Sequence, residues 1–375
     1  MGDLMLKNNE KLRKILKEWF NVDNIVSISP YGGGLINNTY LVEFTDTKYV
    51  LQRINENVFH SPIGVMHNID LITNYIRKQE IYEGKNYRNS TLTVIKTRFD
   101  ENFAIVNDEY WRCYTCIDGV TYDNTTDPEI FKEAGAAIGR FHKLLDGFHT
   151  RLVSDNIKNF HNTPARFEDF TNAVKLNLAG RVRECQDLID FVNARSSTMG
   201  TIVNALETKK IPRRVVHNDT KLNNIMFDRE GKKALCMIDL DTVMKGSLVY
   251  DFGDALRLGA STAKEDETDL SKVNINFELI EAFTEGFLKN IKGLITKEEI
   301  SLLMTGYYTI TLELGMRFLT DYINGDKYFE LNAEQKKKRP KINLERAKNQ
   351  LKLVSIIEEN LNNLEQIVVK TFKKI

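Results

Sequence analysis

Three oxygen-bearing side chains near the middle of the chain have the types and the spacing for chemistry on a phosphate group. Asp219 and Asn224 lie in the segment His217 to Asn224, and Asp239 follows a short apolar run soon afterwards. A carboxylate can orient a hydroxyl group and accept its proton, while an amide and a second carboxylate supply the hard oxygen ligands that Mg²⁺ prefers. Phosphoryl transfer needs this combination because its transition state spreads negative charge over several oxygens. We therefore predict Asp219 as the catalytic residue and Asn224 and Asp239 as metal ligands.

A β-hairpin is expected between Asn224 and Asp239. Two short apolar runs, 225–227 and 234–238, flank a polar turn with a glycine, which is typical of an antiparallel hairpin. The residue before the first strand and the residue after the second then lie at the same end, so Asn224 and Asp239 come together. Asp241 is expected near that end, where it either holds metal as a further ligand or braces the loop. The alternative is a polar turn that only caps the strands.

A second acidic motif, Asp251-Phe252-Gly253, is expected to be structural. It has the letters of the metal-binding tripeptide of protein kinases, but it lies well past the hairpin that already assigns the metal to Asp239. We expect Asp251 to be the N-cap of a helix over 252–258, because an aspartate at that position accepts hydrogen bonds from free backbone amides.

A glycine-rich segment early in the chain is expected to contact the phosphates of a nucleotide. Gly32, Gly33 and Gly34 lie between predicted strands, with Asn38 and Thr39 directly after them. Glycines let backbone amides approach phosphates without a side chain in the way. A plain hairpin turn would have a similar sequence, so the nucleotide interpretation depends on the catalytic segment that follows later in the chain.

The order of the predicted elements favours an α+β fold with two lobes. A small, β-rich, nucleotide-binding lobe takes residues 1–113, and a larger, mostly helical, catalytic and acceptor-binding lobe takes residues 121–375. The hinge is 114–120, where the backbones of Cys116 and Ile117 are expected to pair with adenine. Strands are predicted at 25–29, 39–44, 49–54, 92–97, 102–106 and 110–117, and the longest helices at 65–82, 302–323 and 343–372.

Composition excludes several other classes of protein. The net charge of the 375 residues is zero, so no overall field attracts nucleic acid or an acidic membrane surface. Four cysteines are few, and Cys113 and Cys116 lack the second ligand pair of a zinc site. No apolar run is long enough to cross a membrane, and a reducing cytoplasm is the expected location. The expected partners are a small-molecule sugar and ATP, and the oligomeric state is left open.

The chain resembles the aminoglycoside phosphotransferase and choline kinase superfamily, whose fold is protein-kinase-like. The resemblance rests chiefly on Pro30 to Tyr40, His217 to Asn224, Ile238 to Asp241 and Gly259 to Thr262. The string Asp219-Thr220-Lys221 and the last of these segments are most similar to the sugar 1-kinase branch. That resemblance implies ATP- and Mg²⁺-dependent phosphorylation of the anomeric hydroxyl of N-acetylglucosamine or N-acetylgalactosamine. The alternatives are a kinase for aminoglycosides or other small-molecule hydroxyls on the same fold, and a catalytically silent nucleotide or sugar sensor.

One position departs from the usual pattern of such kinases. They place a lysine on the third strand to hold the nucleotide phosphates, and Gln52 takes that place here, as in the sugar 1-kinase branch. Strand alternation puts Arg53 on the opposite face. Either Arg53 reaches round to the phosphates, or nucleotide binding depends on the glycine segment, Gln52 and the metal.

The acceptor is expected to contact Arg317 and Tyr328 beside Asp219. Arg317 lies one helical turn after Glu313 in an apolar helix, so an ion pair within the helix is the simpler interpretation. Resemblance to the sugar kinases favours a cleft position for Arg317, where a buried charge would bond to sugar hydroxyls. The tyrosine ring is expected to pack on the sugar face or in the core, and His161 is left open between a structural and a functional role.

Overall fold

A five-stranded antiparallel sheet forms the first part of the molecule, in strand order β1-β2-β3-β5-β4. The computed structural model describes residues 10–32, 36–85, 88–329 and 337–375. The sheet follows from short β-branched and aromatic runs, which fit a pleated and half-buried surface. Its strands are β1 (Ser27–Pro30), β2 (Asn38–Glu43), β3 (Lys48–Arg53), β4 (Ala104–Val106) and β5 (Glu109–Thr115).

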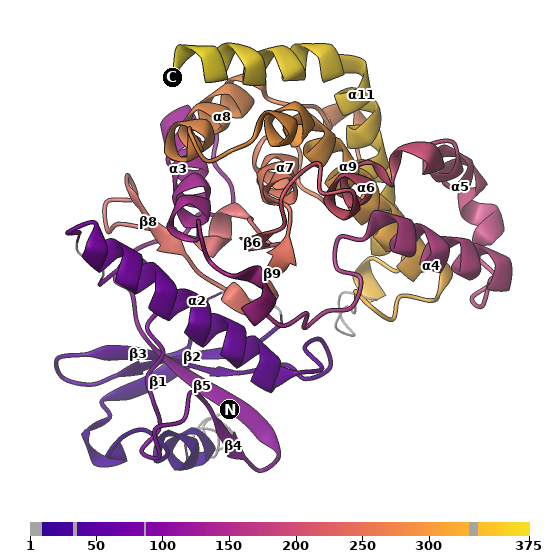
Figure 1. Ribbon diagram of the computed structural model, residues 1–375. Helices are drawn as coiled ribbons and strands as arrows, with labels where there is room; N and C mark the ends of the chain where they lie inside the picture. The colour runs from indigo at the N-terminus through magenta and orange to yellow at the C-terminus, as the bar shows by residue number, and fades with distance from the viewer. Residues whose placement is uncertain (1–9, 33–35, 86–87, 330–336) are drawn as a thin grey trace.

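Helices cover both faces of this sheet. A helical segment over residues 10–16 packs Ile15 and Leu16 against Leu51 and Cys113 on one face. Helix α2 (Pro62–Tyr82) covers the other face and lies between the sheet and the rest of the molecule (Figure 1). The α2 helix begins three residues before the predicted start at residue 65, because Ser61 accepts a hydrogen bond from the Gly64 amide and Pro62 occupies the first turn.

One predicted strand is absent from the sheet. Residues 92–97 were expected to form a full strand, but Val94 forms only an isolated bridge with Tyr114. Two further backbone hydrogen bonds, Ile95 to Cys113 and Thr115 to Thr93, hold this segment beside β5. The segment therefore lies along part of β5 without forming a regular strand. The sequence of such a short apolar run does not distinguish a strand from an irregular segment.

The second part of the chain is mostly helical. Helix α3 packs on α8, and α9 packs on α7 and α11, with α11 farthest from the sheet (Figure 1). The predicted α+β fold with two lobes is confirmed. Among the described residues, no helix is long and apolar enough to cross a membrane. The helices are α3 (Pro128–Leu144), α4 (Thr163–Leu176), α5 (Gln186–Asn193), α6 (Thr201–Glu207), α7 (Leu248–Gly259), α8 (Phe277–Ile291), α9 (Lys297–Ile323) and α11 (Ile342–Lys374).

Helices α7 and α9 touch backbone to backbone. A Cβ atom on Gly253 of α7 would lie 2.6 Å from the backbone of Gly306 on α9. A Cβ atom on Gly306 would lie 2.1 Å from the carbonyl oxygen of Val249. Only glycine permits this approach, and it fixes α9 against α7, the helix whose aspartates bond the backbone of the segment 217–224.

Two small antiparallel pairs position the predicted catalytic segment, residues 217–224, between the lobes. Strand β6 (Arg214–Val216) pairs with β9 (Met244–Gly246), and β7 (Ile225–Phe227) pairs with β8 (Ala234–Met237). The segment 217–224 therefore leaves one pair and enters the next, as the predicted hairpin requires.

Candidate active site

The hairpin brings Asn224 next to Asp219 and to the start of the Asp239 turn. The Asn224 amide nitrogen donates to the Asp219 backbone oxygen at 2.9 Å and to Asp219 Oδ2 at 3.0 Å. The backbone carbonyl oxygen of Asn224 accepts a hydrogen bond from the backbone amide of Ile238 at 2.9 Å, so the two ends of the hairpin are fixed together. Because its nitrogen faces Asp219, the amide oxygen of Asn224 is the atom that can face a cation.

Asp239 turns toward the same point because its backbone is left-handed, with φ 56 and ψ 61. Its side chain is reached by water, yet it lies deep between the lobes. Desolvation by the surrounding protein, and then the carboxylates of Asp241 and Asp219, raise the pKa of Asp239 to about 7. A bound cation would relieve this repulsion.

The donor set fits Mg²⁺. A carboxylate and an amide oxygen are hard ligands, and Mg²⁺ in nucleotide sites takes only one or two protein carboxylates, with phosphates and water as its other ligands. Among the described residues, no group of three His, Cys, Asp or Glu side chains is arranged to hold a metal ion. The pair Asn224 and Asp239 is therefore suited to an ion that arrives with a nucleotide.

Asp241 has a different environment from the open ligand position that the sequence suggested. Its Oδ1 accepts from Arg112 Nη1 at 2.5 Å, and its Oδ2 accepts from Arg112 Nη2 at 3.0 Å and from Asn37 Nδ2 at 2.7 Å. Both oxygens are thus bonded to protein, which corresponds to the bracing role and not to a metal ligand in this state. Arg112 was not among the candidate residues, although it is the one charged residue between Tyr110 and Tyr114 in an apolar strand.

The residues expected to hold the nucleotide phosphates fall partly inside the described chain. Gly32 has φ +74 and no atom within 4 Å of an added Cβ, so its backbone is open to a ligand, whereas Gly33 and Gly34 lie outside the described residues. Asn38 begins β2 and is exposed. Gln52 does not extend toward solvent, because its amide nitrogen donates to Thr39 Oγ1 at 3.0 Å and its oxygen accepts from Arg112.

The hinge segment offers fewer backbone groups than the sequence suggested. The Cys116 amide already donates to the Lys48 carbonyl at 3.0 Å. The Cys116 carbonyl and the Ile117 amide are the remaining groups that can face a base. The Ile117 side chain is buried against Met226 and Cys236, so this part of the hinge is fixed to the catalytic hairpin.

Lys221 is a second residue that the sequence analysis missed. Its Nζ lies 3.1 Å from Asp219 Oδ2, the same oxygen that Asn224 contacts. Burial disfavours the lysine charge, but the nearby Asp219 carboxylate outweighs that effect, and the pKa of Lys221 is raised. Because these side-chain contacts fall on Oδ2, Asp219 Oδ1 is the oxygen that can receive a proton. The sequence signal for this lysine was its position two residues after Asp219, in the string Asp219-Thr220-Lys221.

Buried aspartates of α7 hold the catalytic segment by its backbone. Asp251 was expected to be an N-cap, but Ser247 is the N-cap of α7. The Asp251 carboxylate instead accepts from the backbone amides of His217 and Asn218 at 2.8 and 2.7 Å. Asp254 accepts from the Thr220 amide at 3.1 Å. Asp251 therefore has the structural role that was predicted, but it bonds the backbone amides of His217 and Asn218 and not those at the start of its own helix.

On the expected acceptor side, Arg317 lies among aromatic rings and forms no ion pair with the residues that the structure describes. Its guanidinium carbon is 5.9 Å from the ring centre of Phe160 and 5.5 Å from those of Tyr328 and Phe329. Its Nη2 donates to the Tyr328 hydroxyl at 3.2 Å. Arg317 is half-buried and Tyr328 is exposed, so the pair can meet a ligand. We call Phe160, Arg317, Tyr328 and Phe329 the aromatic–arginine cluster.

The expected ion pair within α9 is replaced by a contact with His161. Glu313 is fully buried, and it accepts from Thr163 Oγ1 at 2.6 Å and bonds His161 Nδ1 at 3.0 Å. His161 Nε2 lies 3.2 Å from the backbone oxygen of Asn218. His161 therefore bridges Glu313 of α9 and the backbone of the segment 217–224. Burial opposes the Glu313 charge, but His161 outweighs it and lowers the Glu313 pKa.

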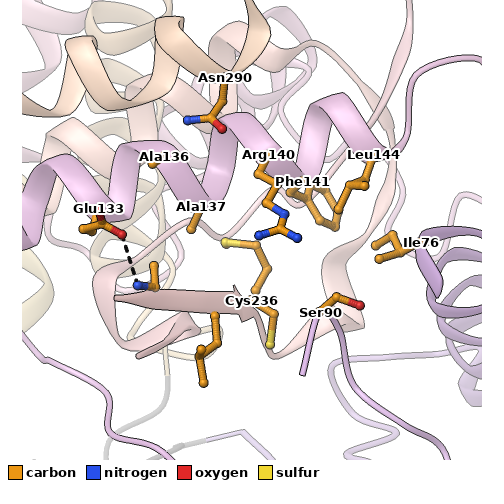
Figure 2. Close-up of a pocket in the computed structure, with 13 residues that line it drawn as sticks. Ile76, Ser90, Glu133, Ala136, Ala137, Arg140, Phe141, Leu144, Cys236 and Asn290 are labelled. Atoms are coloured by element: carbon orange, nitrogen blue, oxygen red, sulfur yellow. Dashed lines mark hydrogen bonds between the residues drawn. The ribbon is translucent and has the colours of Figure 1, made fainter. Parts of the chain in front are cut away.

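A separate cavity of about 200 Å³ lies between α3 and β8. Figure 2 shows Arg140 and Phe141 of α3 facing Cys236 of β8 across it. None of Asp219, Asn224 and Asp239 lines this cavity. It is therefore distinct from the point where the predicted catalytic residues converge.

Comparisons with known proteins identify the family and the fold of the chain. A family model described as "Phosphotransferase enzyme family" matches residues 27–272. An aminoglycoside phosphotransferase from Alicyclobacillus acidocaldarius is similar in fold, with a TM-score of 0.60 and 13% identity, covering 94% of this chain and 96% of that one. A choline kinase from Cryptosporidium parvum Iowa II has a TM-score of 0.57 and 13% identity, with 95% and 97% covered. A spectinomycin phosphotransferase solved with ADP and spectinomycin has a TM-score of 0.51 and 16% identity, with 96% and 98% covered.

Proposed function

Because the chain belongs to the phosphotransferase enzyme family, we propose that it transfers the γ-phosphate of ATP to the anomeric hydroxyl of an N-acetylhexosamine. The convergence of Asp219, Asn224 and Asp239 supports the transfer step. The aromatic–arginine cluster, linked to the catalytic segment through His161, supports the choice of a sugar. The cluster is the observation on which the substrate class rests.

A sugar matches the cluster in both shape and polarity. The apolar face of a pyranose ring packs on aromatic rings, and a guanidinium group donates to hydroxyl and acetamido oxygens. Arg317 supplies such donors among three rings. The Glu313–His161–Asn218 contacts fix the cluster's helix relative to Asp219, so an acceptor held by Arg317 can be oriented against the catalytic carboxylate.

A polycationic acceptor would need free carboxylates beside the cluster. Both oxygens of Glu313 are occupied, one by His161 and the other by Thr163. Asp321 is used by the backbone amides of residues 327–329, and Asp326 pairs with Arg181. These three carboxylates of α9 and the turn after it therefore leave little negative charge for an aminoglycoside, which favours the neutral sugar.

The residues of this chain have separate roles in the proposed reaction. Asp219 Oδ1 orients the anomeric hydroxyl and accepts its proton late, because that hydroxyl is the most acidic of a sugar. Lys221 and Asn224 hold Oδ2 and so fix the rotamer of the carboxylate. Asn224 and Asp239 would hold Mg²⁺, which neutralises phosphate charge when it is bound. Gly32, the Cys116 carbonyl and the Ile117 amide would bind the nucleotide.

The proposal is tested by offering the protein ATP, Mg²⁺ and a panel of acceptors. The panel contains N-acetylglucosamine, N-acetylgalactosamine, glucose, galactose, kanamycin, spectinomycin and choline, with release of ADP as the first readout. We expect turnover with the N-acetylhexosamines, and NMR of the product should show the 1-phosphate. Turnover confined to the antibiotics would replace the sugar with the alternative acceptor, and ADP binding without turnover on any member would support a silent sensor.

A pair of arginine variants tests the acceptor site itself. Arg317→Gln should raise the KM for the sugar by about tenfold or more, because it removes the charged guanidinium that would donate hydrogen bonds to the sugar. The KM for ATP should stay unchanged. Arg346→Gln is the matched control, since Arg346 stacks on Phe318 from α11 but lies outside the cluster. Equal effects of the two changes would remove Arg317 from the acceptor site.

A further inference from the structure

Arg112 on β5 lies beside Gln52 in the sheet. The two residues are partners in the β3–β5 register, and the Gln52 side-chain oxygen accepts from Arg112 Nε at 3.0 Å and from Nη2 at 2.8 Å. The guanidinium is 1% exposed and is also bonded to Asp241. A full positive charge is thus buried at the strand position next to the one where kinases of this architecture carry a lysine.

The same contacts join the two lobes at one carboxylate. Asp241 belongs to the catalytic lobe, and it receives Arg112 from β5 and Asn37 from the loop before β2. The Asn37 side-chain oxygen in turn accepts from the Asn55 amide at 3.0 Å. Two separate segments of the β-rich lobe therefore meet within two residues of the proposed metal ligand Asp239.

Other cations of the sheet are directed elsewhere. Arg53 lies on the opposite face, where it pairs with Glu109 at 3.3 Å. Lys48 pairs with Glu43 at 2.7 Å near the end of the sheet. On α2, the buried Glu80 is bonded to Arg140, so α2 does not use it to hold a strand cation. Arg53, which the sequence offered as the substitute for the missing lysine, is therefore not in position.

We propose that Arg112 replaces the third-strand lysine as a positioning residue, supplying the fixed positive charge of the phosphate site while holding Asp241 away from the nucleotide. The ligand is a nucleoside diphosphate or triphosphate, so the inference rests on the proposed function. The five N–H groups of Arg112 are directed at Gln52, Asp241 and Met66. Its charge therefore acts on the phosphates across a short distance and not by direct contact.

The cost of burying this charge supports a functional reason for keeping it. Removing two charges from water is expensive, and a buried ion pair stabilises a fold no better than apolar side chains of similar volume. Arg112 is bonded to Asp241, two residues after the proposed metal ligand Asp239, so the field of the guanidinium reaches that ligand. Phosphates bound through a metal at Asp239 would experience the same field.

Binding of ADP in EDTA, without Mg²⁺, tests this role directly by calorimetry. Arg112→Gln removes the cation and should weaken ADP binding about tenfold, which is ~1.4 kcal/mol. Asp241→Asn leaves the Arg112 charge without its partner and should tighten ADP binding by about threefold or more. The double variant should return toward the wild-type affinity. Arg53→Gln is the matched control on the opposite face and should stay within about twofold of wild type.

The opposite signs separate a charge effect from a loss of structure. A purely structural ion pair predicts that Arg112→Gln and Asp241→Asn both weaken ADP binding, or both leave it unchanged, and either result would overturn the proposal. Circular dichroism and melting curves establish that each variant is folded. If Arg112→Gln does not fold, the affinity of Asp241→Asn decides alone, and unchanged or weaker binding refutes the idea. A wild-type protein that binds no ADP even when Mg²⁺ is present would instead refute the proposed function.

Discussion

Asp239→Asn is expected to stabilise the nucleotide-free protein while removing its activity. Asp239 lies near Asp241 and Asp219, and desolvation and these two carboxylates raise its pKa to about 7. Replacing the carboxylate by a neutral amide of the same shape removes this repulsion. The same change removes the proposed metal ligand, so catalysis should fall by a large factor although the fold becomes more stable.

The magnitude follows from the difference between the folded and ordinary pKa values. The span from 3.8 to about 7 corresponds to at most about 4 kcal/mol at 1.36 kcal/mol per pKa unit. Water reaches the Asp239 side chain, and solvent screening reduces this to about 1–2 kcal/mol. At about 2.1 cal/mol/K per residue for 375 residues, the melting temperature should rise by about 2 °C.

The sign of the pH dependence is fixed by the raised pKa. The folded state binds the Asp239 proton more tightly than the unfolded state, so wild-type stability falls as the pH rises from about 4 toward about 7. The variant lacks this group. Its advantage should therefore be less than half complete at pH 4 and complete at pH 8, as measured by thermal melting without divalent metal.

A matched control is available on the turn of the same hairpin. Backbone amides, chiefly that of Lys232, lower the pKa of Asp228, so Asp228→Asn should be neutral or destabilising at pH 8. The reasoning would be refuted if Asp239→Asn melted below the wild type at pH 8. An equal advantage of the variant at pH 4 and pH 8 would refute it as well.

Three further changes test other parts of the structure. His161→Asn leaves Glu313 buried without its ionic partner and should lower the free energy of unfolding by about 3 kcal/mol in urea; a loss below 1 kcal/mol would contradict the assigned pair. Asp219→Asn should lower kcat about 10²- to 10⁴-fold while the Kd for ADP stays within about twofold, and near-normal turnover would exclude Asp219 as the base. Gly253→Ala places a Cβ 2.6 Å from the Gly306 backbone and should cost about 2 kcal/mol or more, so an unchanged melting temperature would show that the α7–α9 contact relaxes freely.

The elements with strong local signals were predictable from sequence. The start of α3 at Asp127-Pro128 can be read from the sequence, because the cap and the proline act through their own backbone neighbours. The catalytic hairpin was equally predictable, since two apolar runs around a polar turn have one simple pairing. The irregular structure of segment 92–97 was not predictable. A short apolar run has the same sequence pattern whether it forms a regular strand or an irregular segment beside one.

The sequence by itself determined the two-lobed fold and the end of the hairpin where Asp219, Asn224 and Asp239 meet, because these depend on local periodicity and on residues close in the chain. Only the tertiary structure decided the partners of the buried charges. Arg112 joins Asp241, and His161 joins Glu313 to the catalytic segment, across long stretches of sequence. A buried charge must be paired, but any of several carboxylates would satisfy it, and the choice is made by how sheet and helices pack.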